Sequence, residues 1–396
     1  MANVSSSNGL EKYPKLRFKG FSEPWKKTPF SKLYRYVSEK NDGSLGVDKI
    51  ISVANMYFKP DARISDEEYL RTYNVFRLGD IAFEGNKSKN FAFGRFVENT
   101  IGDGIVSHVF VVFRPLHHDH NLGYWKYAIN NENVMGRILA RCTKKTTMMT
   151  NLVSDDFLEE EMFCPSNAEQ RKISSFLELL ERKIDAQIKL VEHLKKYKRG
   201  ASNSFFNDKA VSNSSSVLPF GQTVEINPKT KSLPTDFIYI DLESVESGKL
   251  LHKNIISHDN APSRAQRVLS KGDVLFQMVR PYQKNNFYFE SELSLPSVAS
   301  TGYAQIRCND NDPLFVFEQI SSDYFSNQAM LRSTGTGYPA INADSLAEIP
   351  FIKFPIEEQR KIGKFLYLLS QRIVQEESKL DSLFKVKAAM LQSLFI

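Results

Sequence analysis

The sequence contains very little cysteine. Among its 396 residues only three are cysteine, Cys142, Cys164 and Cys308, and no two of them form a CxxC pair. Few, isolated and odd-numbered cysteines argue against a disulfide framework or a zinc ribbon and suit a reducing compartment. We therefore expect a cytoplasmic protein.

Long hydrophobic runs are missing as well. No apolar stretch approaches the roughly eighteen residues of a membrane span, and the first residues show no signal-peptide pattern, so we expect neither membrane insertion nor export. Hydrophobic residues make up 41% of the chain and charged residues 25%, the composition of an ordinary globular protein. The net charge of +6 favours an acidic partner such as nucleic acid.

Sequence signatures of catalysis are also absent. There is no P-loop GxxxxGK[ST], and the Gly-rich GTGYP at 335–339 lacks the lysine and helix start that phosphate binding needs, so it predicts a turn. The run His117, His118, Asp119, His120 has no ligand partners at helical spacing, so we interpret it as a solvated loop and expect no metal site. We therefore expect no catalytic residue and no cofactor in this chain.

The sequence does contain one long helical pattern twice. The first copy runs from Glu169 to Phe206 and the second from Glu358 to Phe395, and both copies open with EQRKI. This repeat, at an offset of 189 residues, divides the chain into two halves. Each half is predicted to consist of a globular segment followed by a long helix.

Apolar residues in both copies recur in steps of three and four residues, the heptad spacing of a narrow coiled-coil seam. At 1.5 Å per residue the seam would be roughly 50 Å long. We expect the two helices to pair with each other in antiparallel orientation; alternatively, each helix covers only its own globular segment. The predicted seam residues are Ile173, Leu177, Leu180, Ile184, Val191 and Leu194 in the first copy, and Ile362, Leu366, Leu369, Ile373, Leu380 and Leu383 in the second.

One seam position is polar in both copies, Gln187 in the first and Glu376 in the second. A polar seam residue lowers stability but can fix register and partner.

The globular segments share landmarks but little else. GDIAF at 79–83 corresponds to GDVLF at 272–276, and SDDFL at 154–158 corresponds to NADSL at 342–346. Short β-rich runs between turn signals, with helical pieces among them, predict a mixed α/β (α+β) fold. A common frame with divergent interiors suggests one task performed on two different targets.

A basic and aromatic stretch, PKLRFKGFSEPWKKTPFSKL, precedes the first segment. Interleaved basic and aromatic residues can bind nucleic acid. They can equally form an arm that docks its aromatic rings on the body, and this second interpretation is favoured.

In layout and motifs the chain resembles the specificity subunit of type I restriction–modification systems. The resemblance rests on the PKLRFKGF opening, the two GD[IV]xF strands, and STGTGYPAINADSLAEIPF followed by FPIEEQRKIGKFL. It covers nearly the whole chain. The second half matches the family pattern more closely than the first, where TKKTTMMTNLVSDDFLEEEMFCP replaces the Gly-rich version.

The resemblance implies two similar target recognition domains separated by two long antiparallel coiled-coil helices, related by a pseudo-two-fold repeat. The implied organisation is an N-terminal arm at 1–29, a first target recognition domain at 30–165, a central spacer helix at 166–206, a linker at 207–219, a second target recognition domain at 220–355 and a C-terminal spacer helix at 356–396.

The implied function is to give a restriction–modification complex its DNA specificity. Each domain would read one half of a split, asymmetric target in double-stranded DNA, while the helices set the spacing and dock two methyltransferase subunits; restriction subunits would complete the nuclease. S-adenosylmethionine, ATP and Mg²⁺ would belong to those partners, since the chain lacks the [DNS]PP[YF] tetrapeptide of adenine methyltransferases. The alternatives are a stand-alone DNA-modifying enzyme and a coiled-coil structural adaptor without sequence-specific DNA binding.

Contacts to DNA are expected in the polar loops that follow the two GD strands and in a second polar loop of each segment. Arg and Gln are shaped to bind base edges, and Lys and Arg bind phosphates; for any single residue, a solvated surface charge is the alternative. The predicted contacts are Asn86, Lys87, Lys89, Arg95, Arg141, Lys144 and Lys145 in the first segment, and Gln277, Arg280, Tyr282, Gln283, Lys284, Arg332, Thr334 and Tyr338 in the second.

Overall fold

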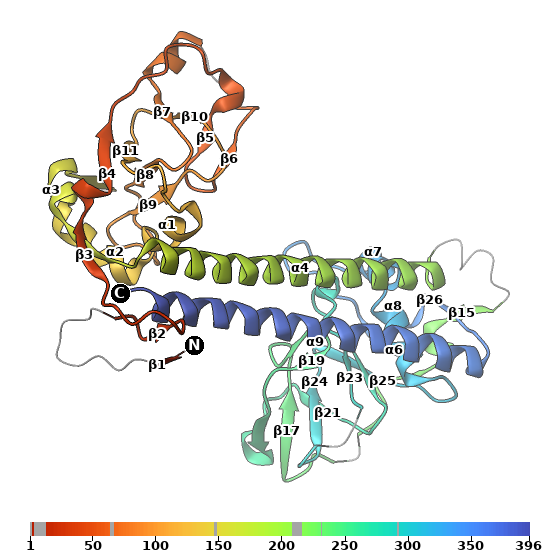
Figure 1. Ribbon diagram of the computed structural model, residues 1–396. Helices are drawn as coiled ribbons and strands as arrows, with labels where there is room; N and C mark the ends of the chain where they lie inside the picture. Colours follow the sequence, from red (N-terminus) through yellow and green to blue (C-terminus); the bar gives the residue numbers. More distant parts are fainter. Residues whose placement is uncertain are drawn as a thin grey trace. The chain divides into compact units, whose positions relative to one another are not determined.

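Two long helices, α4 (Asn167–Phe205) and α9 (Ile356–Leu394), begin 189 residues apart in the computed structural model (Figure 1). The structure describes residues 13–63, 67–145, 149–207, 216–230, 232–290 and 293–396, and the backbone of a short strand β1 (Ala2–Asn3). The chain divides into two units, of which the first comprises Met1–Ala186 with Leu380–Ile396, and the second comprises Gln187–Lys379. Each unit therefore contains one part of both long helices.

The first unit is built on a four-stranded antiparallel sheet in the order β4-β11-β8-β9. Its strand β8 carries IAF of the GDIAF motif, and those three residues are buried. Helices cover the sheet, and shorter strand pairs extend the unit. The strands of the sheet are β4 (Tyr34–Val37), β11 (Val111–Pro115), β8 (Ile81–Glu84) and β9 (Arg95–Glu98); the helices are α1 (Leu122–Ala128), α2 (Glu132–Cys142) and α3 (Ser154–Glu159); and the pairs are β1 with β2 (Leu16–Arg17), β3 (Lys26–Pro29) with β14 (Glu161–Cys164), β5 (Ile51–Ser52) with β6 (Tyr57–Phe58), β7 (Asn74–Phe76) with β10 (Gly104–Val106), and β12 (Thr143–Lys145) with β13 (Thr150–Leu152).

The second unit repeats this sheet as β16-β25-β22-β23, again antiparallel throughout. It also contains a second sheet, β20-β17-β24-β21, in which β17 and β24 run parallel. The elements are β16 (Glu225–Ile226), β25 (Tyr303–Arg307), β22 (Val274–Gln277), β23 (Phe287–Tyr288), β20 (Asn254–Ser257), β17 (Asp236–Ile240), β24 (Ser297–Ser300), β21 (Ala265–Val268), β15 (Val217–Pro219) paired with β26 (Pro350–Ile352), β18 (Val245–Glu246) paired with β19 (Lys249–Leu250), α6 (Pro313–Ile320), α7 (Asp323–Leu331) and α8 (Ala343–Ala347).

The shared landmarks therefore occupy equivalent elements, because the GD motifs lead into β8 and β22, and SDDFL and NADSL lie at α3 and α8. The units diverge mainly between β4 and β8 in the first and between β16 and β22 in the second. There the described residues of the second unit form β17, β20 and β21, which join the later strand β24 in the additional four-stranded sheet. The predicted α+β fold with an internal repeat is confirmed.

An aromatic core supports each unit. In the first, the ring of Phe157 lies 4.4 Å from Phe30, 4.5 Å from Phe96 and 5.0 Å from Phe113, centroid to centroid. In the second, Phe220 takes the place of Phe30 and lies 5.3 Å from Phe351. Burying one such ring contributes roughly 1.5–3 kcal/mol, so these clusters hold the two frames together.

The long helices run antiparallel within each unit. In the first unit, Lys387 of α9 forms an ion pair with Glu181 of α4 at 2.8 Å. In the second, Gln187 donates to Glu376 at 2.8 Å, and Tyr197 contacts Phe365. Residue numbers thus rise along α4 as they fall along α9, which confirms the predicted antiparallel pair.

Most predicted seam residues lie in the interior. Ile173 and Leu177 belong to the core of the first unit, and Ile362 and Leu366 belong to that of the second, so the first turns of each helix do cover their own segment. The predicted pairing is therefore confirmed, and the alternative that each helix covers only its own segment is wrong. The buried members are Ile173, Leu177, Leu180, Ile184, Val191, Ile362, Leu366 and Ile373, and the half-buried ones are Leu194, Leu369, Leu380 and Leu383.

The last turn of each helix packs into the unit in which the other helix begins. Phe395 follows α9 and lies 5.5 Å from Tyr124 in the first unit's core. Phe206 follows α4 and lies 5.6 Å from Phe315 in the second unit's core. Each globular core thus contains residues from the start of one long helix and from the end of the other.

No helix in the described part of the chain combines the length and apolar character that crossing a bilayer requires.

Candidate nucleic-acid interface

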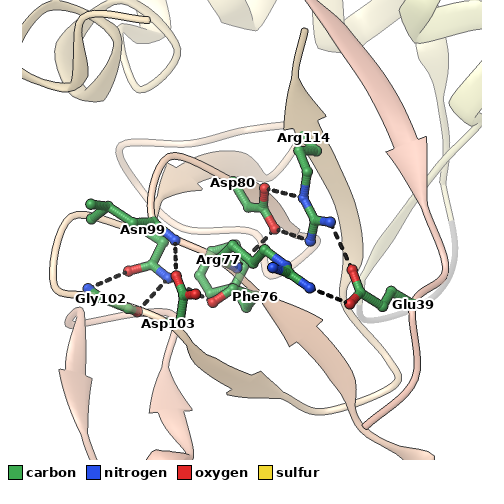
Figure 2. Close-up of polar contacts among 9 residues, drawn as sticks. Glu39, Phe76, Arg77, Asp80, Asn99, Gly102, Asp103 and Arg114 are labelled. Carbon is green, nitrogen blue, oxygen red and sulfur yellow. Dashed lines mark hydrogen bonds and ion pairs between the residues drawn. The ribbon is translucent and has the colours of Figure 1, made fainter. Parts of the chain in front are cut away.

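The GD motif forms a structural turn at the entrance to the central strand. Gly79 has a positive φ of +88°, which favours glycine, and the Asp80 carboxylate accepts a hydrogen bond from the Arg77 backbone N–H at 2.8 Å. Arg114 of the neighbouring strand binds both carboxylate oxygens of Asp80 at 2.9 Å and also pairs with Glu39 (Figure 2). The motif therefore anchors strand β8 against strand β11.

Burial raises the pKa of Asp80, and its hydrogen bonds with Arg114 only partly offset this effect. Glu39, by contrast, is held ionised, because hydrogen bonds from Arg77 and Arg114 lower its pKa.

The second unit builds the same turn. Gly272 has φ +91°, and Asp273 accepts from the Ser270 backbone N–H at 2.8 Å. Gln305 and Arg307 of β25 complete the carboxylate's hydrogen bonds at 2.7 and 3.1 Å. Because these buried aspartates are fully engaged in anchoring strands, the GD motifs carry structure rather than chemistry.

The two polar loops predicted in the first segment lie together. Residues 85–94 after β8 meet the β12–β13 hairpin through a bridge between Asn86 and Met149. Thr150 donates its hydroxyl to the carbonyl oxygens of Gly85 and Phe93, at 3.1 and 2.9 Å. A Cβ at Gly85 would lie 2.2 Å from the Thr150 carbonyl oxygen, so the close approach requires glycine.

Several of the predicted DNA contacts lie where these two loops meet. Asn86, Lys87 and Lys89 are exposed on the first loop, and Lys144 and Lys145 are exposed on β12. Thr146, Thr147 and Met148 of this hairpin lie outside the described residues.

The two arginines predicted in this segment are engaged elsewhere. Arg95 pairs with Glu84 at 2.7 Å and donates to the Ala54 carbonyl at 3.0 Å. Arg141 forms two hydrogen bonds to Glu160, at 2.7 and 2.5 Å, beside a pocket also lined by Asp156, Glu159 and Glu161. Lys27 also lines this pocket, so four carboxylates face two basic side chains there. A contact of Arg141 with DNA stays a prediction.

The second unit brings its two predicted loops together in the same way. Residues 278–286 after β22 meet residues 334–340 through a bridge between Val279 and Ala340, the counterpart of the Asn86–Met149 bridge. The guanidinium of Arg280 lies over the ring of Tyr338, 4.2 Å from its centroid. The Arg280 backbone N–H donates to the Pro339 carbonyl at 2.7 Å. We call this junction in either unit the loop pair.

Backbone strain marks the second loop pair. Arg280 and Lys284 have φ of +55° and +53° and flank the short 3₁₀ helix η6 (Pro281–Gln283). Non-glycine residues in this conformation cost roughly 1–3 kcal/mol each and persist where packing imposes them. Tyr282, between them, is 52% exposed, and Tyr338 is 70% exposed. This loop pair thus presents two exposed tyrosine rings and one guanidinium.

The other predicted contacts of this segment have different settings. Gln277 is buried and donates to the Gln283 side chain at 2.8 Å, while accepting from the Asn285 backbone N–H. Lys284 pairs with Asp323 at 2.5 Å. Arg332 donates to Gln328 at 2.6 Å, and Thr334 is exposed beside the bridge to Ala340.

One exposed side chain near the loop pair was not predicted. Leu331 is 78% exposed at the end of α7, directly before Arg332. Its exposure could not be predicted from the sequence, because no sequence pattern distinguishes an exposed leucine at the end of a short helix from a buried one.

The histidine run departs from the expected solvated loop. His120 is largely buried and hydrogen-bonds Glu98 at 2.6 Å. Burial raises the pKa of Glu98 and lowers that of His120, because it disfavours the charged form of each side chain. His117 and His118 are exposed, as expected. Among the residues that the structure describes, no group of three or more His, Cys, Asp or Glu side chains could hold a metal ion.

Comparison with known proteins gives one relative in sequence. The chain is 28% identical over 165 residues to the type I restriction enzyme HindI specificity subunit of Haemophilus influenzae. The match covers 40% of this chain and 35% of that protein, so it spans about a third of the relative's length. No family model matches the chain.

Solved structures match along nearly the whole chain. The S subunit of a type I restriction–modification system from M. genitalium is 18% identical, with a TM-score of 0.57 over 97% of this chain and 99% of that one. The HsdS subunit from Thermoanaerobacter tengcongensis is 15% identical, with a TM-score of 0.50 over 98% and 99%. A chain from a structure of the complex assembly and conformational transition of the type I R-M system is 16% identical, with a TM-score of 0.55 over 94% of this chain and 97% of that one. The resemblance predicted from the sequence is thereby confirmed, and the fold is that of these subunits.

Proposed function

We propose that this chain, which shares its fold with type I specificity subunits and part of its sequence with one of them, reads a split DNA target for a restriction–modification complex. Each unit binds one half of the target through its loop pair. Lys side chains bind phosphates, and Arg280 with the exposed tyrosines contacts bases or sugars.

The observation that carries the proposal is the recurrence of the loop pair. The same two loops are joined by the same bridge beside the same four-stranded sheet in both units, yet their side chains differ. The first presents Lys87, Lys89, Lys144 and Lys145, while the second presents a stacked arginine and two tyrosines. A shared sheet and loop arrangement with different side chains is what two different half-sites require.

The helices supply the spacing in this proposal. A helix of 39 residues is roughly 58 Å long, enough to serve major grooves about one helical turn, ~34–36 Å, apart. We further propose that the helix pair docks two methyltransferase subunits and that restriction subunits join the complex. The predicted division into an arm, two target recognition domains, a linker and two spacer helices remains part of this proposal.

Catalysis is assigned to the partners. S-adenosylmethionine, ATP and Mg²⁺ would be bound by the methyltransferase and restriction subunits, and this chain would supply only specificity. The buried aspartates of the GD motifs support this assignment, because both are fully engaged by arginine and backbone N–H groups.

Sequencing of methylated adenines in the host genome, with and without this gene, tests the proposal. We expect methylation at a single split sequence to vanish without the gene and to return on complementation. Methyl transfer from labelled S-adenosylmethionine to DNA by the purified chain alone would establish a stand-alone enzyme instead. An assembled complex without any sequence preference would establish a structural adaptor.

A further inference from the structure

The N-terminal arm occupies an apolar groove in the first unit. Phe18 packs edge-on against Phe176 of α4, with ring centroids 5.7 Å apart. Leu16 and Phe18 lie against the core that also includes Met390 and Leu394 of α9. The arm therefore fills the groove between the start of one long helix and the end of the other.

A buried ion pair fixes the arm beside this groove. Arg17 binds both carboxylate oxygens of Glu169, at 2.7 and 2.8 Å, and both side chains are almost fully buried. Trp25 donates to the same carboxylate at 3.1 Å. Arginine followed by phenylalanine is thus the element that Glu169 and Phe176 recognise.

The repeat places the same features in the second unit. Phe365 and Glu358 are the counterparts of Phe176 and Glu169, 189 residues further along. Phe365 and Tyr197 are 39% and 58% exposed, and they line a groove of about 670 Å³ between the end of α4 and the start of α9. The remaining residues that line it are His193, Lys196, Gly200, Ala201, Ser204 and Phe205.

Within the described part of the chain, this second groove lacks an arm. Glu358 is exposed, and its carboxylate has no hydrogen-bond or ion-pair partner among the described residues. The segment that precedes β15, DKAVSNSSS at 208–216, contains neither arginine nor an aromatic residue that could take the places of Arg17 and Phe18.

We propose that the groove of the second unit binds an extended segment of a partner protein that carries arginine followed by an aromatic residue. The arginine pairs with Glu358, and the aromatic ring packs on Phe365 and Tyr197. The first unit provides the precedent, since its own arm makes these contacts with the equivalent residues. The inference goes beyond DNA recognition and does not depend on it.

A labelled peptide copying residues 13–27 (YPKLRFKGFSEPWKK) tests the proposal with the full chain, without DNA. We expect saturable binding by fluorescence anisotropy, and binding about tenfold weaker or worse to the Glu358→Gln variant, because a charge-assisted bidentate contact is lost. Glu357→Gln is the matched control, since Glu357 already pairs with Arg360, and it should bind normally.

A second variant tests the groove itself. A Cβ at Gly200 meets no atom within 4 Å, so Gly200→Trp should fold, fill the groove and abolish peptide binding. A peptide with alanine in place of Arg17 and Phe18 should not bind. Failure of the native peptide to bind, or binding that neither Glu358→Gln nor Gly200→Trp weakens, would overturn the proposal, the latter because the peptide would then be displacing the arm of the first unit.

Discussion

At the scale of single residues, Arg280 joins a left-handed backbone to a guanidinium stacked on an exposed ring. Its backbone N–H donates a hydrogen bond to the Pro339 carbonyl of the facing loop, which fixes the position of its Cα. A fixed guanidinium loses less entropy on binding than a free one, which makes Arg280 the strongest base-contact candidate of the second loop pair.

Replacing Arg280 by alanine should weaken specific DNA binding of the assembled complex by about tenfold or more, since a lost base contact costs roughly 1–3 kcal/mol. Arg280→Lys keeps the charge but not the planar fork, so it should retain binding to non-specific DNA and lose preference for the target. Equilibrium binding to target and scrambled duplexes measures both. Equal affinity of wild type and Arg280→Ala for the target would remove Arg280 from the interface.

Glu181 gives a prediction for pH. Burial opposes its ionisation, but hydrogen bonds with Lys387 and Lys126 outweigh that effect and lower its pKa to about 2. Because the folded-state pKa lies below the ordinary value of 4.5, the contribution to stability is complete above about pH 5 and disappears as the pH falls toward 2.

The difference in unfolding free energy between wild type and Glu181→Gln should therefore be largest near pH 7 and shrink steadily below about pH 5. Urea unfolding across this pH range measures it. Glu178→Gln, at an exposed position of the same helix, serves as the control. A difference that stays constant down to about pH 3 would contradict the assignment.

At the scale of elements, the long helices meet through their two polar seam residues. Gln187 donates to both the side chain and the backbone carbonyl of Glu376, at 2.8 and 3.0 Å. Arg372 and Lys379 also pair with this carboxylate, and the hydrogen bond from Gln187 leads the effects that lower its pKa. The repeat-related polar positions thus pair with each other, and any shift of register would separate them.

A matched insertion tests whether these helices set the spacing of the target. Four residues inserted after Gln187 and four inserted before Glu376 would face each other and lengthen the pair by about 6 Å. We expect the unread gap of the target to grow by about two base pairs, at ~3.4 Å per pair. Methylome sequencing reports the gap, and four residues added to the predicted linker at 207–219 should leave it unchanged. An unaltered gap after the matched insertion would end the spacer hypothesis.

At the scale of the whole molecule, the chain contains two similar units that share their two long helices. Each unit takes the start of one long helix and the end of the other, and the closing phenylalanines Phe206 and Phe395 lie in the two cores. The first unit combines Met1–Ala186 with Leu380–Ile396, so truncation before Phe395 should destabilise it.

Exchanging residues 30–165 for those of a related specificity subunit should change one half of the recognised sequence and preserve the other. The physical reason is that the loop pair of each unit is built from residues of that unit alone. Sequencing methylated adenines after the exchange provides the measurement. Altered bases in both halves of the target would show that the two units do not recognise DNA independently.

Much of this fold could be predicted from local sequence patterns. The repeat, the two long helices, their antiparallel pairing and the GD strands were predictable because periodicity and turn chemistry act over a few neighbouring residues. The polar seam positions were also visible, although their mutual hydrogen bond was not.

The tertiary structure decided the surroundings of each predicted contact residue. It buried Gln277, paired Arg141 with Glu160 and Lys284 with Asp323, and left Tyr282 and Tyr338 exposed. It also brought residues 85–94 to the β12–β13 hairpin and filled one groove with the arm, whereas no described residue takes the arm's place in the counterpart groove. These outcomes depend on contacts between irregular loops far apart in the chain. Unlike the pairing of the two long helices, such contacts leave no periodic pattern in the sequence.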